Sequence, residues 1–219
     1  MSNYATQLLN LLAATLLLLT FAMLSQRRIL SLIHLFTLHG ATLAAATTLV
    51  AFATNDHHLY FSAALTLLLK VALIPWILHK LILQLNVKWD VEPLFNVPTM
   101  MLVGIVLVII AFNLALPIAQ LSSSIARGTL GIALACILLS FMMMITRSKA
   151  VPQVIGFLSM ENGLFFAAMA ATNGMPMIVE LGIALDILVG ILILGVFMFQ
   201  IRERFDNLDI HNLEKLKED

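Results

Sequence analysis

Charged residues are scarce in this sequence, and their scarcity excludes most soluble proteins. Asp, Glu, Lys and Arg make up 11% of the 219 residues, whereas soluble domains carry about 25%. The formal net charge is zero, which gives no basis for a nucleic-acid partner. Hydrophobic residues make up 61%, and the mean hydropathy is +1.02. We therefore predict an integral membrane protein whose first partner is the lipid bilayer.

Residue types that build catalytic or metal sites are also few. The single cysteine, Cys136, excludes a disulfide framework within the chain. The sequence contains no glycine-rich phosphate loop, no cluster of Cys and His, and no nucleophile arrangement. The "DHH" at 56–58 is the nearest approach to a metal motif, but a short surface loop explains it more simply. We expect no catalytic residue, bound cofactor or metal ion in this chain.

Long apolar runs fill the rest of the sequence. A membrane-spanning helix needs about 20 mostly apolar residues. The runs do not alternate between polar and apolar residues as the strands of a membrane barrel do. They predict an all-α polytopic membrane protein with about seven transmembrane helices, at 4–24, 29–53, 59–85, 98–119, 125–146, 151–172 and 176–201.

Lys and Arg fall almost entirely in alternate turns, which predicts the orientation. Cytoplasmic loops are enriched in these residues, so we expect the N-terminus outside and the C-terminus in the cytoplasm. The spans group as three, one and three, and 25–47 faintly resembles 146–172, so an internal duplication remains open. The expected units are an N-terminal three-helix unit, a linking helix, a second three-helix unit and a cytoplasmic tail, at 1–90, 91–120, 121–204 and 205–219.

Ionisable residues lie near the middle of four of these spans: His39, Lys70, Glu161 and Asp186. An unpaired charge at the bilayer centre costs about 2.5–3.5 kcal/mol, so these groups must face protein, water or each other. Acids and bases at this depth mark ion pathways or proton relays by default. We predict that Lys70, Glu161 and Asp186 form a proton pathway; the alternative is a set of structural ion pairs.

Three of the polar residues have a second plausible role. His39, and His34 one turn or so closer to the cytoplasm, also fit hydrogen-bonded packing between helices. Glu180 lies near the outer end of the last predicted span, where a carboxylate can reach the interface. All three are kept as candidates for the proton pathway.

Local sequence around the central lysine and acid adds detail. Pro75 follows Lys70 by five residues, and its ring frees a carbonyl near Val71, which predicts an irregular helix beside the lysine. Asn162 directly follows Glu161 and makes a polar patch within an apolar span.

The C-terminal third carries a family resemblance. The stretches "GFLSMENG" at 156–163 and "VELGIALDILVG…LDIHNLEKLKE" at 179–218 resemble the hydrogenase-4 component E family, and a looser likeness extends through "SAALTLLLKVALIPW". That family consists of membrane subunits of group 4 [NiFe]-hydrogenase and formate hydrogenlyase complexes. The last three spans also resemble the K subunit of complex I and the C subunit of Mrp-type antiporters.

The resemblance implies a non-catalytic subunit of a complex I-related, redox-driven oxidoreductase that translocates protons across a prokaryotic inner (plasma) membrane. Iron–sulfur clusters and a nickel–iron centre would belong to partner subunits. The implied partners are antiporter-like and other membrane subunits, together with peripheral hydrogenase-type or quinone-module subunits.

The same resemblance assigns roles residue by residue. Asp186 occupies the place of the K subunit's last-helix glutamate, four residues before Gly190. Where the K subunit has its other glutamate, this chain has Leu158, and Glu161 follows three residues later, about one helical turn along the same face. Lys70 matches a lysine of component E and has no counterpart in the K subunit.

Two other classes of seven-helix membrane protein are alternatives. A small-solute carrier with the same three-one-three layout needs an uncharged central pocket lined by aromatic residues. Here Trp76 lies toward one end of its span and charges lie in the middle. A retinal pump needs a lysine in its last helix, where this chain has Asp186. The proton-conducting subunit is therefore favoured, and the solute carrier is its alternative.

Overall fold

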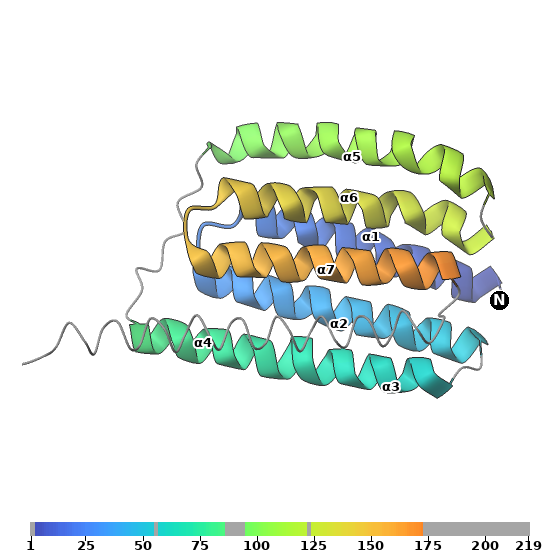
Figure 1. The fold of residues 1–219 in the computed structure, drawn as a ribbon, viewed down its shortest axis with the longest axis horizontal. Helices are drawn as coiled ribbons and strands as arrows, with labels where there is room; N and C mark the ends of the chain where they lie inside the picture. Colours follow the sequence, from blue (N-terminus) through green and yellow to red (C-terminus); the bar gives the residue numbers. More distant parts are fainter. Residues whose placement is uncertain (1–2, 55–56, 86–94, 122–123, 173–219) are drawn as a thin grey trace, which may run out of the picture. The chain divides into compact units, whose positions relative to one another are not determined.

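The computed structural model describes residues 3–54, 57–85, 95–121 and 124–172, all within one compact unit of the chain. These residues are helical apart from short turns, so the all-helical prediction is confirmed for them. The π-helix η1 joins α3 to α4, and the three segments continue one another as a single long helix (Figure 1). The elements are α1 (Asn3–Ser25), α2 (Ile29–Thr54), α3 (His57–Thr66), η1 (Leu67–Leu73), α4 (Ile74–Leu85), α5 (Val97–Leu121), α6 (Ser124–Thr146) and α7 (Ala150–Thr172).

Helices long and apolar enough to cross a membrane coincide with the first five predicted spans. Within the described residues they are Tyr4–Ser25, Ile29–Thr54, Leu59–Lys80, Val97–Pro117 and Thr129–Thr146. This result confirms a membrane protein.

The sixth predicted span is helical in the structure, and the seventh lies outside the described residues. Helix α7 forms where the sixth span is predicted, but it is not among the five candidate membrane helices found within the described residues. The seventh predicted span and the predicted tail lie outside the described residues. The count of seven therefore stays a prediction, as does the orientation.

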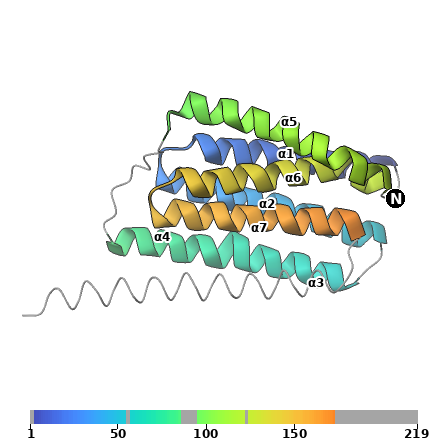
Figure 2. The same cartoon turned by 45° about the horizontal axis from the view of Figure 1, so that its top comes forward.

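Helices α1, α2, α6 and α7 pack around a shared core. Helix α7 packs against α6 and α2, while α1 packs against α2 and α6 (Figures 1 and 2). The helix made of α3, η1 and α4 lies along α2, and α5 packs against α6 and α1. Fully or almost fully buried side chains from both predicted three-helix units build the core, among them Leu9, Leu16, Leu43, Ala133 and Phe166.

Glycines bring α6 and α7 into close contact. A Cβ atom added at Gly156 would lie 3.1 Å from the backbone nitrogen of Met144, and one at Gly163 would lie 2.9 Å from Cγ1 of Ile137. Small residues at such positions let helix backbones approach closely in membranes. The approach fixes the depth and rotation of α7, and with it the position of Glu161.

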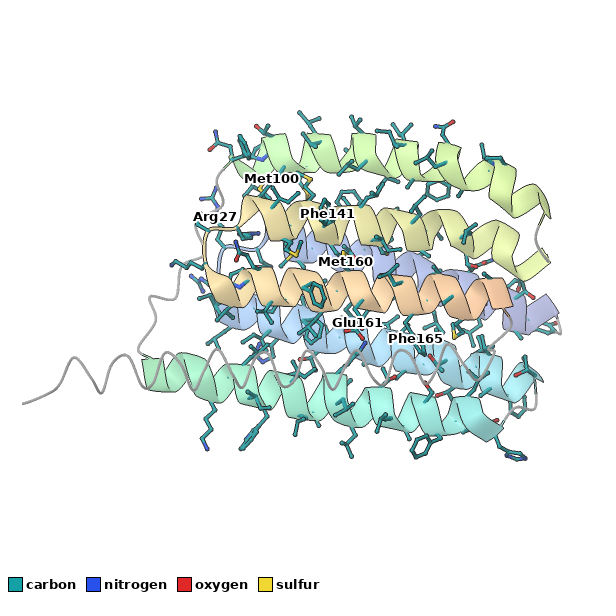
Figure 3. The ribbon with its side chains drawn as sticks, viewed as in Figure 1. Arg27, Met100, Phe141, Met160, Glu161 and Phe165 are labelled. Atoms are coloured by element: carbon teal, nitrogen blue, oxygen red, sulfur yellow. The ribbon has the colours of Figure 1, made fainter. Side chains whose placement is uncertain are left out.

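The basic turns at 25–28 and 147–149 lie at one end of the bundle, where Arg147 is buried. Its Nη2 atom donates to the carbonyl oxygen of Leu24 at 2.7 Å, which ties the turn after α6 to the C-terminal end of α1. Arg27 lies at the same end (Figure 3). Carbonyls at a helix C-terminus carry partial negative charge, so they suit a guanidinium. Burial lowers the pKa of Arg147 to about 10, and the group stays cationic at neutral pH.

Candidate functional site

Five buried polar side chains from four helices meet inside the bundle. Lys70 comes from η1, Glu161 and Asn162 come from α7, His39 comes from α2, and Thr20 comes from α1. Lys70 is 2% exposed and Glu161 is 4% exposed, so neither charge reaches the lipid-facing surface. We refer to these five residues as the polar cluster.

An ion pair forms one end of the polar cluster. The Nζ atom of Lys70 lies 3.1 Å from Oε1 of Glu161 and donates to Oδ1 of Asn162 at 2.7 Å. Glu161 lies midway along α7, on the side toward α2 and η1 (Figure 3). Lys70 and Glu161 thus face each other, which is one of the three arrangements expected for the central ionisable groups. Each charge is held by an opposite charge or a polar group, as burial in a low-dielectric interior requires.

Hydrogen bonds extend the polar cluster across the bundle to α1. The Nδ2 atom of Asn162 lies 3.0 Å from Nδ1 of His39, and Nε2 of His39 lies 3.2 Å from the hydroxyl oxygen of Thr20. The Thr20 hydroxyl donates to the carbonyl oxygen of Leu16 at 2.8 Å. The polar cluster therefore forms a continuous hydrogen-bonded path from η1 to α1.

The irregular backbone beside Lys70 takes the form of a π-helix. The backbone N–H of Ile74 donates to the carbonyl oxygen of Leu69, five residues earlier, instead of the residue four earlier. Pro75, which follows directly, has no N–H to continue the α-helical pattern. Short π-helical turns occur frequently at functional sites. The irregularity expected near Pro75 therefore lies at Lys70 itself.

A glycine in α2 admits the backbone of η1. A Cβ atom added at Gly40 would lie 3.2 Å from Cβ of Lys70 and 3.6 Å from its carbonyl carbon. Gly40 directly follows His39, so the close approach also brings the imidazole to the depth of the lysine. Helix α2 thereby contributes both the space for Lys70 and a member of the polar cluster.

The other predicted site residues are placed elsewhere or lie outside the described residues. His34 is exposed on α2, and its Nδ1 donates to the carbonyl oxygen of Leu30 at 2.7 Å, so the structure does not bring it into the polar cluster. Glu180 and Asp186 lie outside the described residues. His57, from the "DHH" stretch, is exposed, and the described part of the chain holds no group of three or more potential metal ligands.

Trp76 does not line an interior pocket. Its side chain is 61% exposed, and the Nζ atom of Lys80 lies 5.2 Å from its ring. An aromatic wall around a central substrate, as a solute carrier needs, is therefore not supplied by this tryptophan.

Sequence reasoning missed Thr20 and did not foresee how Asn162 joins two helices. Threonines are frequent in these apolar helices, and most bond a carbonyl of their own helix, as Thr37 and Thr47 do. Thr20 makes the same bond, and nothing in the sequence distinguishes it. For Asn162, adjacency to Glu161 was the usable signal.

Comparison with known proteins gives two kinds of relative. The chain is 30% identical over 194 residues to an uncharacterized protein of Mycobacterium tuberculosis, Rv0085, with 88% of each chain covered. It is 24% identical over 148 residues to hydrogenase-4 component E of Escherichia coli K12, with 68% of each chain covered, and component E of Shigella flexneri gives the same values. No family model and no solved structure matches the sequence.

Proposed function

This chain belongs to the family of the mycobacterial protein Rv0085, and from that premise we propose that it is a membrane subunit of a hydrogenase-related complex. The similarity to hydrogenase-4 component E, a distant one, supports the type of complex. The five apolar helices support the membrane location. We propose that the subunit conducts or gates protons in the inner membrane of a prokaryote.

The buried ion pair of Lys70 and Glu161 is the observation that carries this proposal. An ammonium and a carboxylate 3.1 Å apart can exchange a proton across one hydrogen bond. A buried ion pair contributes little net stability compared with apolar residues of similar size, so stability alone is a poor explanation for it. Ionisable groups at this depth are costly and mark proton relays.

The proposed mechanism alternates the charge of the pair. Glu161 takes up a proton when a charge in a neighbouring subunit changes, and it releases the proton when that charge returns. Lys70 sets the proton affinity of Glu161 or passes the proton itself. We further propose Asp186 as the next carboxylate along the pathway, with Glu180 toward the outer surface. The redox chemistry of iron–sulfur and nickel–iron centres would belong to other subunits.

Proton translocation by the assembled complex tests this function. Membrane vesicles carrying the complex would be assayed for protons moved per electron transferred, with wild-type and Glu161→Gln subunits at matched abundance. The matched control is Ser159→Ala, which removes the hydrogen bond of a buried serine in the same helix to Ser140 at 2.8 Å without touching a titratable group. We expect Glu161→Gln to lose most of the coupling and Ser159→Ala to retain it.

An unchanged proton-to-electron ratio in the assembled Glu161→Gln complex would contradict the proposal. Sugar or other solute flux through the purified single chain would favour the solute carrier instead. The buried ion pair and the exposed Trp76 both argue against that carrier.

A further inference from the structure

The direction of the hydrogen bonds in the polar cluster is fixed by Lys70. An ammonium group has three donors and no acceptor, so the atom of Asn162 that faces it at 2.7 Å must be the amide oxygen. The amide nitrogen of Asn162 then faces His39, where it can only donate. Nδ1 of His39 must therefore accept, which means that this nitrogen carries no proton.

Thr20 completes the assignment at the opposite side of the imidazole ring. A neutral imidazole with an unprotonated Nδ1 carries its proton at Nε2, which can donate to the Thr20 oxygen. The Thr20 hydroxyl then donates to the carbonyl oxygen of Leu16. The contacts of Thr20 are therefore compatible with the tautomer that Asn162 requires.

From these contacts we infer that Asn162 is a hydrogen-bond switch that prevents Lys70 and Nδ1 of His39 from being protonated together. Protonation at Nδ1 would require an acceptor, and Asn162 can offer its oxygen only by rotating its amide. The amide nitrogen would then point at Lys70, and only a neutral amine can accept that hydrogen bond. Asn162 is thus a positioning residue that couples the two bases.

This coupling gives the pathway a second proton-holding site. When Lys70 transfers a proton to Glu161, a neutral amine and a carboxylic acid remain, and the number of protons is unchanged. Only in that state does the rotated amide of Asn162 allow a proton arriving from elsewhere to occupy Nδ1 of His39. The tautomer assignment stands on the hydrogen bonds alone, whereas its use in proton transfer rests on the proposed function.

Nitrogen NMR of the full-length chain in lipid bilayers tests the tautomer. Histidine side chains would be labelled with ¹⁵N, and the His39 signals would be identified by their loss in His39→Gln. We expect Nδ1 to be unprotonated and Nε2 to be protonated in the wild type. A protonated Nδ1 in the wild type would overturn the inference without any variant in the pathway being needed.

A double variant tests the coupling to Lys70. In the wild type the Glu161 carboxylate holds Lys70 as an ammonium, which should keep Nδ1 of His39 unprotonated. Replacing both charged residues, Lys70→Met with Glu161→Gln, removes the group that fixes the amide without leaving an unpaired carboxylate. The Nδ1-protonated fraction should then rise about tenfold or more, since a hydrogen bond to a charged group is lost.

Equal tautomer ratios in the wild type and the double variant would overturn the switch. Thr20→Val is the matched control, because Asn162 still donates to Nδ1 in it, and a change of tautomer there would also count against the inference. The result is independent of proton translocation. Suppose that NMR confirms the tautomer but the Glu161→Gln complex still moves the wild-type number of protons per electron. The proposed function would then be rejected, and the hydrogen-bond assignment would stand.

Discussion

Replacing Lys70 by methionine should destabilise the folded chain in a strongly pH-dependent way. The substitution leaves the Glu161 carboxyl buried at 4% exposure without the ammonium 3.1 Å away. Removing one partner of a buried ion pair typically costs about 3–5 kcal/mol. The carboxyl can limit this cost by taking up a proton, because a neutral acid is less costly to bury than a carboxylate.

The cost of that proton sets the expected magnitude. An ordinary glutamate side chain titrates near a pKa of about 4.3, so keeping it protonated at pH 7 costs about 3.7 kcal/mol, at about 1.36 kcal/mol per pH unit. At pH 5.5 the same cost is about 1.6 kcal/mol. The folded variant holds a proton that a water-exposed carboxyl releases above this pKa, so the stability of the variant falls as pH rises.

Thermal unfolding in detergent measures this effect. For a chain of this length, about 1 kcal/mol corresponds to about 2–4 °C in Tm, so Lys70→Met should lower Tm by about 7–15 °C at pH 7. The loss should be less than half as large at pH 5.5. The double variant Lys70→Met with Glu161→Gln should recover most of the stability, because no charge remains buried. Additive losses in the double variant, or a loss that does not depend on pH, would refute this account of the pair.

Further predictions concern the contacts around the polar cluster. Gly40→Val should separate α2 from η1 and lower stability by about 1–3 kcal/mol, since even a Cβ atom there would lie 3.2 Å from Cβ of Lys70. Thermal unfolding measures the loss, and Gly40→Ala, with its smaller side chain, is the comparison variant. Gly163→Ala should weaken the packing of α7 on α6 by a similar amount, read by the same assay. Arg147→Gln should leave the pH dependence of Tm unchanged between pH 6 and 8. The Arg147 side chain has a pKa of about 10 in the folded chain, so it stays protonated over this range. Its titration changes the stability of the wild type only above about pH 10. Asp186→Asn should preserve assembly and redox activity but reduce protons moved per electron, and a wild-type ratio in the assembled complex would contradict its proposed role.

Much of the fold follows from properties that the sequence carries locally. Length and hydropathy suffice to place helices α1, α2 and α5, because each is an apolar run of the required length ended by polar turns. Depth counted along each span also brings Lys70 and Glu161 to the same level. Because neither charge can face lipid, the sequence limits each one to contacts with protein, water or another of the central groups, but it does not say which of them pair.

The rest of the site depends on rotation about helix axes, which composition does not encode. His34 and His39 are polar residues of the same helix, yet one is exposed and the other lies in the polar cluster. Gly40, directly after His39, lets the backbone of η1 approach α2 at that position. Thr20 enters the polar cluster through helix packing alone. The π-helix was also beyond prediction in detail, since proline indicates where a helix becomes irregular but not which irregular form results.

The π-helix at Leu67–Leu73 also fixes the angular phase between the two halves of its long helix. A regular α-helix turns by about 100° for each residue, and a π-helical turn accommodates one residue more than an α-helical turn. Deleting a single leucine before Lys70 would therefore let a regular α-helix form over the same rotation, and α3 and α4 would keep their faces. Deleting a residue from α4, which has no extra residue to lose, would instead turn every later residue by about 100°. The π-helix is thus a position in the long helix where the chain can lose one residue and keep both halves in register, at the expense of the irregular backbone beside Lys70.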